Sequence, residues 1–397
     1  MQAHPILGHV ALGYSPVIDR HRSVLATRLT VFPSRPDAQI DGAALLQALQ
    51  ESFPDGRSQL LRVPPKHAVT LVLNLAGESL LLSVLAAPPV PRFMIEVPSF
   101  IASDPAHSAL LDAAALAAPL ALKGPLRSPL PPAVASAFAA SVVDDDVGTG
   151  GAGLPRLRAG ITRLGELDGA FAKNAVAAVG WPFGDPPVGP AKTTVAPEIK
   201  TILELINRVD AEEPVDRLEA LLKNDPTLAF RLLRYINSPA FGLSVEVSSF
   251  RHALMILGYQ RLKRWLALLL ASASKDASMK PVMFAAVRRG LLMEELVKSS
   301  DDKDMRGEMF ICGVFSLLDR LLRQSFAELL RSVPVPERVR QALGSQEGPF
   351  QPYLELVQAI ENESVIDMRE CADKLMIGPA EINRALLAAL AAAAQLE

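Results

Sequence analysis

The sequence predicts an α/β domain followed by an all-helical domain, and three observations lead to this prediction. Of the 32 prolines, 23 lie in residues 1–200 and nine in residues 201–397. Residues 1–190 carry 14 basic and 15 acidic side chains, whereas residues 191–397 carry 26 and 28, as exposed helix faces do. Short apolar runs alternate with helical stretches in the first part, while apolar residues three and four apart dominate the second.

A proline-rich stretch separates the two parts. It reads FGDPPVGPAKTTVAPE (183–198), and proline and glycine at this density cannot continue a helix. The domain boundaries that follow are 1–188 for the first domain, 189–196 for the linker and 197–397 for the second domain. Each domain is long enough to bury a core of its own.

In the first part, short apolar runs predict strands and the stretches between them predict helices. HAVTLVLNLAG (67–77) is apolar enough for a strand buried on both faces. Asp104 is a candidate N-cap, with Pro105 at the first helical position. Repeated strand–helix units imply a parallel sheet, either open or closed into a barrel. The other predicted elements are helices at 41–53, 104–118 and 131–140, and strands at 92–97, 119–124 and 141–146.

The second part has the apolar spacing of amphipathic helices throughout. No strand-like alternation appears in it, so this domain is predicted to be all-α. The predicted helices are 197–209, 215–224, 226–237, 250–273, 283–298, 307–331, 335–343, 351–361, 367–375 and 379–395.

Composition excludes several classes of protein. Half of the residues are hydrophobic and 21% are charged, which excludes wholesale disorder. The net charge of −3 gives no global field that favours nucleic acid or an anionic membrane. The two cysteines, Cys312 and Cys371, lie far apart, which argues against a disulfide scaffold or a cysteine zinc site. With no targeting segment and no apolar run of membrane-spanning length, we expect a cytoplasmic protein without membrane insertion.

The most specific pattern lies in the second part. Residues 224–243 read NDPTLAFRLLRYINSPAFGL, and residues 248–266 read SSFRHALMILGYQRLKRWL. This order of motifs resembles the signature of HDOD domains, which are helical relatives of the HD-type metal phosphohydrolases. The resemblance covers about residues 195–395. Within it, Gly258 is expected to let two helices approach each other closely.

The resemblance implies that phosphohydrolase chemistry is absent from this domain. An HD enzyme needs several histidines and aspartates to hold metal ions and polarise water, but His252 is the only histidine of the second part. FICGVFSLLDRLL (310–322) resembles the helix that carries the His-Asp pair. By that placement the pair becomes Ser316-Leu317, and Asp319 lies nearby without histidine partners. The domain is therefore expected to be catalytically inactive.

Four stretches of the first part form a second pattern: SPVIDRHRSVLATRLTVF (15–32), LVLNLAGESLL (71–81), RFMIEV (92–97) and GWPFGDP (180–186). They resemble the degenerate EAL domains that precede HDOD domains. The EAL domain is the phosphodiesterase fold for the bacterial second messenger cyclic di-GMP. The resemblance places Arg28 where the E-A-L motif has an acidic metal ligand, Asn74 at a metal-binding Asn, Glu96 at a metal-binding Glu, and Val179 where a Gln is usual. It implies a shortened, degenerate EAL-type α/β barrel.

The segment DDVGTG (145–150) can be placed against that pattern in two ways. It reads like the DDFGTG motif of active EAL domains, but it begins 49 residues after Glu96, about double one strand–helix–strand step. The favoured placement puts Lys123 at the place of the aspartate pair, and a long insertion before a true DDFGTG is the alternative. The favoured degenerate pocket therefore holds Arg28, Asn74, Glu96 and Lys123. Two cations there would repel magnesium, which needs several oxygen ligands.

A basic group on one predicted helix is the candidate partner surface. It consists of Arg261, Lys263 and Arg264 beside Tyr259 and Trp265. In a helix, Arg261 and Arg264 share a face, and aromatic and arginine side chains are enriched at interface anchors. A solvated helix face is the default interpretation of these charges, and docking of an acidic partner is the alternative. If Trp265 is buried, only the charges are exposed.

Together these patterns predict a bacterial signal-transduction protein that acts through protein–protein binding, with no catalytic residues, cofactor or metal. Other signalling proteins are the expected partners, with self-association as a further option. A cyclic di-GMP sensor without hydrolysis is the alternative, and residual phosphodiesterase activity is a weaker one. Nucleic acid is not expected as a partner, because the helix–turn–helix-like residues 367–387 carry few donors for phosphates and bases.

Overall fold

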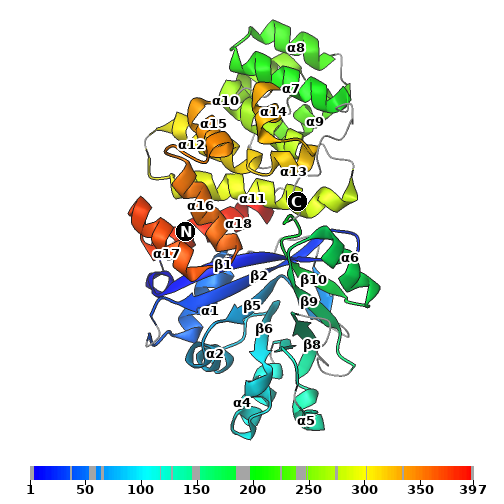
Figure 1. The fold of residues 1–397 in the computed structure, drawn as a ribbon, viewed down its shortest axis with the longest axis vertical. Helices are drawn as coiled ribbons and strands as arrows, with labels where there is room; N and C mark the ends of the chain where they lie inside the picture. The colour runs from blue at the N-terminus through cyan, green and yellow to red at the C-terminus, as the bar shows by residue number, and fades with distance from the viewer. Residues whose placement is uncertain are drawn as a thin grey trace.

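The fold has a strand barrel at one end and a helical region at the other, as Figure 1 shows. The structure is a computed structural model, and the residues that it describes form fourteen segments. They are residues 4–35, 38–52, 60–63, 67–116, 118–126, 128–144, 153–184, 197–223, 226–237, 247, 249–272, 276–300, 302–332 and 335–394. The predicted linker 189–196 and the segment 145–150 lie outside the described residues.

Eight strands close into a barrel in the order β1–β10–β9–β8–β7–β6–β5–β2. Strand β1 runs antiparallel to β2 and β10, and all the other neighbouring pairs are parallel. The barrel form of the two predicted alternatives is therefore confirmed. The strands are β1 (Val10–Ile18), β2 (Val24–Pro33), β5 (Leu71–Leu75), β6 (Phe93–Pro98), β7 (Leu120–Lys123), β8 (Phe138–Val143), β9 (Arg156–Ile161) and β10 (Ala177–Gly180).

One apolar cluster fills the interior of the barrel. Only the inner face of a closed barrel can bring all eight strands into a single cluster, and alanine at many of these positions leaves room for the strands to close. The hairpin of β3 (Leu61–Val63) and β4 (His67–Val69) adds its apolar residues where the parallel strands begin. The strand members are Val17, Ala26, Val72, Met94, Ala121, Ala140, Val142, Leu157, Ala159, Ala177 and Val179.

The helices of the barrel region agree with the predictions in part. Asp104 accepts a hydrogen bond from the backbone nitrogen of Ala106 (2.9 Å) and caps η2, which leads into α4. The predicted helix 131–140 is wrong in its second half, because β8 already begins at Phe138 and pairs with β7. The elements β9, α6 and β10 were not predicted from periodicity. The helices are α1 (Gly42–Ser52), α2 (Glu78–Leu85), α3 (Ser99–Ala102), η2 (Pro105–His107), α4 (Ser108–Ala115), α5 (Pro132–Ala135) and α6 (Leu164–Ala172).

From residue 197 onward, the described residues contain helices and no strand, as predicted. The predicted helix 307–331 is divided into three helices, with breaks at Ser316-Leu317 and at the left-handed Arg323. The helices are α7 (Pro197–Asp210), α8 (Val215–Lys223), α9 (Pro226–Ile236), α10 (Phe250–Ala271), α11 (Lys280–Leu296), α12 (Lys303–Phe315), α13 (Leu318–Leu322), α14 (Phe326–Ser332), α15 (Glu337–Arg340), α16 (Gln351–Glu361), α17 (Val365–Leu375) and α18 (Pro379–Ala394).

Gly258 has a different role from the one predicted. A Cβ atom placed on it would meet no described atom within 4 Å, so the predicted close approach of two helices is wrong. Its backbone instead has φ 67° and ψ 171°, which breaks α10 into two helical halves. Glycine is favoured here because a residue with a Cβ rarely adopts this positive φ.

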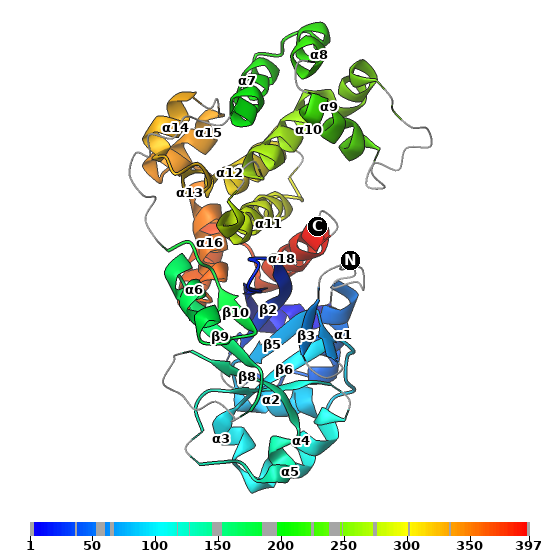
Figure 2. The same ribbon diagram turned by 90° about the vertical axis from the view of Figure 1, so that its right-hand side faces the viewer.

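The last helices of the chain pack onto the barrel. Figure 1 shows α16 and α18 between α11 and strand β1, and Figure 2 shows α18 beside α11 from another side. Helix α18 contacts β1 and the 3-10 turn η1 (Pro5–His9) that precedes it. The buried side chain of Asn383 on α18 accepts from the Leu12 nitrogen (3.1 Å) and donates to the Leu7 and Val10 carbonyls (2.7 Å each). The barrel exterior and the helical region therefore share one continuous apolar core.

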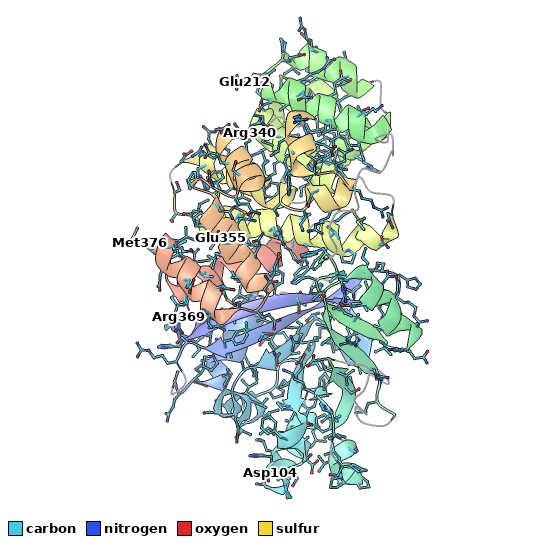
Figure 3. The ribbon with its side chains drawn as sticks, in the orientation of Figure 1. Asp104, Glu212, Arg340, Glu355, Arg369 and Met376 are labelled. Carbon is cyan, nitrogen blue, oxygen red and sulfur yellow. The ribbon has the colours of Figure 1, made fainter. Side chains whose placement is uncertain are left out.

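Helix α17 lies on the outer side of this arrangement. Arg369 in the middle of α17 donates to the carbonyl of Ser34 just after β2 (3.3 Å), and Figure 3 labels Arg369 beside the barrel. Met376, in the turn before α18, is exposed. Among the described helices, no single one has both the length and the apolar character needed to cross a membrane. The pair α17 and α18, bent by 107°, passes that test only when the two are taken together.

Candidate functional site

The mouth of the barrel brings together the four side chains of the predicted pocket. Residues two apart on a strand point to the same face. A residue two positions after a member of the apolar cluster inside the barrel therefore also faces the lumen. This step leads from Ala26 to Arg28 on β2, from Val72 to Asn74 on β5, from Met94 to Glu96 on β6, and from Ala121 to Lys123 on β7. These four strands are consecutive neighbours in the barrel. The four side chains therefore gather at the end of the barrel where the parallel strands finish.

Arg28 and Glu96 form a bidentate ion pair at this mouth. The Arg28 Nε and Nη2 atoms donate to Glu96 Oε1 and Oε2, at 2.7 and 2.9 Å. The Glu96 side chain is 0% exposed and that of Arg28 is 10% exposed. Lys123 Nζ donates to Asn74 Oδ1 (2.7 Å) and lies 3.9 Å from Glu96 Oε2. The four side chains thus satisfy one another.

A fifth side chain enters the mouth from outside the barrel. Glu363 follows α16, and both of its carboxylate oxygens lie 3.3 Å from Arg28 Nη1. Ser15 on β1 donates to the same carboxylate at 3.5 Å. Sequence reasoning missed Glu363 because 335 residues separate it from Arg28 and no local motif marks it. The mouth therefore contains two cations and two carboxylates supplied by both halves of the molecule.

The charges at the mouth hold the guanidinium of Arg28 in its protonated form. Burial by itself lowers the pKa of Arg28, but the charge and hydrogen bonds of Glu96, with further charge from Glu363 and Asp144, raise it above its ordinary value. The carboxylates of Glu96 and Glu363 are therefore both engaged with a permanent cation, and Asp144 adds a further negative charge near it. Among the described residues, no group of three or more His, Cys, Asp or Glu side chains could hold a metal ion. The donor set at the mouth does not fit the metal ions of a phosphodiesterase.

The position where the HD resemblance places a His-Asp pair contains a second Arg–Glu ion pair. Arg289 on α11 donates from Nε and Nη2 to Glu361 of α16 at 2.7 to 3.0 Å, and both side chains are at most 5% exposed. Arg289 Nη1 also donates to the Ser316 hydroxyl (3.0 Å), which itself donates to the Gly313 carbonyl (2.7 Å). Burial raises the pKa of the nearby Asp319. We call this group the helical centre.

Aromatic side chains connect the helical centre to the barrel. Trp181, just after β10, donates from Nε1 to the Tyr14 carbonyl (3.1 Å), and the two rings meet edge to face with centroids 5.3 Å apart. The Arg289 guanidinium lies 5.3 Å from the centroid of the Phe183 ring. Burial, followed by the charge of Glu361, raises the pKa of the Tyr14 phenol well above its ordinary value. Trp181 and Phe183 therefore contribute to the interface between the two halves.

The predicted partner surface on α10 is only partly exposed. Trp265 as a surface anchor is wrong, because its side chain is buried and stacks on Tyr235 with ring centroids 6.1 Å apart. Lys263 is paired with Asp210 and Arg264 with Glu294, at 2.6 and 2.5 Å. Tyr259 donates to the carbonyl of Glu213 (2.8 Å). Arg261 is exposed, and its role in binding a partner stays a prediction.

Comparison with known proteins gives a family match in the second half of the chain. Residues 194–331 match the family model of the HDOD domain. The cyclic di-GMP phosphodiesterase CdgJ of Vibrio cholerae is 32% identical over 169 residues, which are 42% of this chain and 39% of that protein. The uncharacterized protein YuxH of Bacillus subtilis is 30% identical over 179 residues, 43% of each chain. The matched region thus spans about two fifths of the length of these curated relatives. No solved structure gives a significant match.

The HDOD match includes most of the helical centre and excludes the mouth of the barrel. Arg289, Ser316 and Asp319 lie inside it, whereas the barrel and helices α16 to α18 lie outside it. The resemblance of the barrel to an EAL domain rests on its eight strands and on the residues at its mouth. The chain contains an HDOD domain over residues 194–331.

Proposed function

We propose that this protein is a non-enzymatic signal-transduction protein, related to cyclic di-GMP signalling, that acts by binding other proteins through its HDOD domain and a degenerate EAL-type barrel. The HDOD match and the relative named as a cyclic di-GMP phosphodiesterase support the signalling class. The antiparallel β1 in an otherwise parallel eight-strand barrel, with Asn74 and Glu96 at its mouth, supports the EAL-type assignment. The observation that carries the proposal is the bidentate Arg28–Glu96 ion pair.

The ion pair argues against hydrolysis on chemical grounds. Metal-assisted phosphodiester cleavage needs oxygen ligands that hold divalent ions and generate a hydroxide nucleophile. Here each oxygen of the Glu96 carboxylate accepts from Arg28, and the Asn74 side-chain oxygen accepts from Lys123. A divalent ion would have to displace both cations, and unpairing them in this buried position is unfavourable. The mouth is therefore better suited to structure or binding than to catalysis.

The helical centre supports the same conclusion for the HDOD domain. By the HD resemblance, Ser316-Leu317 stands in place of the metal-binding His-Asp pair, and the Ser316 hydroxyl accepts from Arg289 and donates to the Gly313 carbonyl. Glu361 is the carboxylate closest to that arginine and is saturated by it. What remains exposed in this domain is helix surface, which suits docking of another protein.

A hydrolysis assay tests the proposal. The full chain is incubated with cyclic di-GMP and either magnesium or manganese, and the linear dinucleotide is measured by chromatography. We expect no turnover above the buffer blank. Turnover that disappears in the Glu96→Gln variant, with circular dichroism showing an unchanged fold, would contradict the proposal and establish a phosphodiesterase.

A cyclic di-GMP sensor without hydrolysis is the second candidate, and one observation favours it. The Lys123 side chain is 29% exposed at the mouth, and cations in this position can pair with phosphate oxygens. Titration calorimetry of the full chain with cyclic di-GMP decides between the candidates. Micromolar binding that is lost in Lys123→Met would favour the cyclic di-GMP sensor over the protein that acts only by binding other proteins. The absence of any heat of binding would favour the protein-binding role.

A further inference from the structure

A three-residue segment at the end of α16 supplies a carboxylate to each of the two centres. Glu361 forms the buried ion pair with Arg289 in the helical centre. Two residues later, Glu363 lies on Arg28 at the mouth of the barrel. Two structural centres from different domains therefore share one short piece of backbone, residues 361–363.

The two carboxylates of this segment lie on opposite faces of strand β1. Gly13 and Ser15 alternate with Leu12 and Tyr14 along the strand, so the two pairs point to opposite faces. Ser15 pairs in register with Arg28 and contacts Glu363 on the lumen side. Tyr14 lies on the other side, where Glu361 perturbs its phenol.

Gly13 permits the close approach of the segment. A Cβ atom at this position would lie 2.9 Å from Glu363 Cγ and 3.1 Å from the Ile360 carbonyl oxygen. Contacts this short would force the segment away from the strand. The absence of a side chain at position 13 is thus a requirement of the contact between α16 and the barrel.

The backbone of the segment holds the two carboxylates in a fixed relation. The Asn362 nitrogen donates to the Gln358 carbonyl (2.9 Å), and the Ser364 nitrogen donates to the Ala359 carbonyl (3.0 Å). Glu363 itself has φ 55°, the left-handed conformation that commonly ends a helix. These bonds close the end of α16, so the two carboxylates project from one hydrogen-bonded turn.

We propose that residues 361–363 form a latch that couples the mouth of the barrel to the helical centre. Release of Glu363 from Arg28 loosens Glu361 from Arg289, and the reverse holds by thermodynamic reciprocity. The opened mouth loses one negative charge, which leaves Arg28 and Lys123 to share Glu96. The proposal rests on the proposed function in one respect, because it takes the mouth to be a regulatory and not a catalytic site.

Hydrogen exchange followed by mass spectrometry tests the latch on the full chain. The variant is Glu363→Gln. The Glu363 side chain is 22% exposed and that of its partner Arg28 is 10% exposed, so the substitution does not leave Arg28 fully cut off from water. Among the described residues, the Glu363 side chain makes its polar contacts with Arg28 and Ser15, and neither lies on α11. The readout is the exchange rate of peptides from α11, which carries Arg289. We expect exchange in α11 to rise at least about fivefold.

Two controls separate the latch from a general loss of stability. Glu370→Gln removes the same charge from an exposed position on α17 and should leave α11 unchanged. Peptides from β8 and α7 should keep their wild-type rates in Glu363→Gln. If Glu363→Gln raises the exchange rate of peptides from β1 and β2 while α11 exchanges as in the wild type, the mouth and the helical centre are independent and the latch is refuted.

A second variant keeps the test decisive if Glu363→Gln is poorly folded. Glu363→Asp retains the charge but withdraws it from Arg28 by one methylene, and the same rise in α11 exchange is expected from it. Unchanged α11 exchange in Glu363→Asp, with faster exchange in β2, also refutes the latch. None of these readouts involves nucleotide turnover, so a refuted latch would leave the result of the hydrolysis assay untouched.

Discussion

The mouth of the barrel and the helical centre use the same ion pair in different surroundings. At the mouth, Arg28 and Glu96 lie on strands of one sheet, and Lys123 and Glu363 are within reach of the pair. In the helical centre, Arg289 lies within the HDOD domain, but its partner Glu361 comes from a helix beyond the matched residues. Arg28 thus has one carboxylate partner within the barrel and a second from the C-terminal region, whereas Arg289 depends on the C-terminal helices for its carboxylate.

The largest loss of stability is expected when the Arg289–Glu361 ion pair is broken, because Arg289 has no second carboxylate partner in the described residues. Glu361→Gln leaves a fully buried Arg289 without its carboxylate, and we expect a loss of about 3–5 kcal/mol in the free energy of unfolding. Glu96→Gln should cost less, about 1–3 kcal/mol, because Glu363 remains 3.3 Å from Arg28. Chemical denaturation of both variants provides the comparison.

A double variant sharpens this test. Replacing the whole pair with Arg289→Met and Glu361→Leu removes both charges, and such replacements of buried ion pairs are often neutral or stabilising. We expect the double variant to recover most of the stability lost in Glu361→Gln. If Glu96→Gln proves more damaging than Glu361→Gln, Glu363 does not compensate Arg28 and the ranking of the two ion pairs is wrong.

The second effect concerns the surface where the two regions meet. Gly13→Ala inserts a methyl group 2.9 Å from Glu363 Cγ and should lower the free energy of unfolding by about 1–3 kcal/mol. Gly8→Ala is the matched control, because its methyl group would meet only the Ala380 Cβ atom at an ordinary 3.8 Å. Thermal unfolding of both variants measures the difference. Equal melting temperatures would show that the segment adjusts freely around position 13.

The third effect is a dependence of stability on alkaline pH. The pKa of Tyr14 is raised in the folded state, so the neutral phenol contributes stability that is fully present below its ordinary value of about 10. That contribution is lost as the pH rises above this value towards the folded-state pKa. We expect the wild type to lose stability between about pH 10 and pH 11 more steeply than Tyr14→Phe does. Parallel slopes in denaturation series would contradict the buried environment of this phenol.

The smallest effect on stability concerns the exposed face of α10. Arg261→Glu should change the free energy of unfolding by less than about 0.5 kcal/mol, because an exposed charge contributes little. The same variant should weaken recovery of native partners in a pull-down with the full chain as bait. Arg331→Glu on α14 is a matched exposed control. Equal recovery with both variants would remove this face of α10 as a docking surface.

Local patterns predicted the parts of the fold that neighbouring residues determine. The four polar residues of the mouth were grouped by the resemblance to EAL domains and not by periodicity, and the structure brings them together on the consecutive strands β2, β5, β6 and β7. The strand at Phe138 was predicted as helix, because alanine-rich residues have helical propensity and the pairing with β7 overrides it. Trp265 was a candidate surface anchor because aromatic side chains are enriched at interfaces, with burial as the alternative, and the structure shows it buried.

The contacts between the two halves could not be predicted from the sequence. The residues around Glu361 and Glu363 read ENES, a short polar stretch that usually marks a solvated turn. Their partners Arg289 and Arg28 lie 72 and 335 residues away. Asn383 is similar, because it is a lone polar residue in an alanine-rich helix whose partners are backbone atoms of β1 and η1. Such contacts depend on tertiary packing, which periodicity does not encode.

The central claim is that cations have replaced metal ions at the mouth of the barrel. A titration of the full chain with Mn²⁺, followed by the electron paramagnetic resonance signal of the free ion, tests this claim most directly. The ion pair of Arg28 and Glu96 predicts that the signal rises as in buffer, with no stoichiometric binding at micromolar concentrations. One or two bound ions per chain that are lost in Glu96→Gln would contradict the claim and restore a metal site at the mouth.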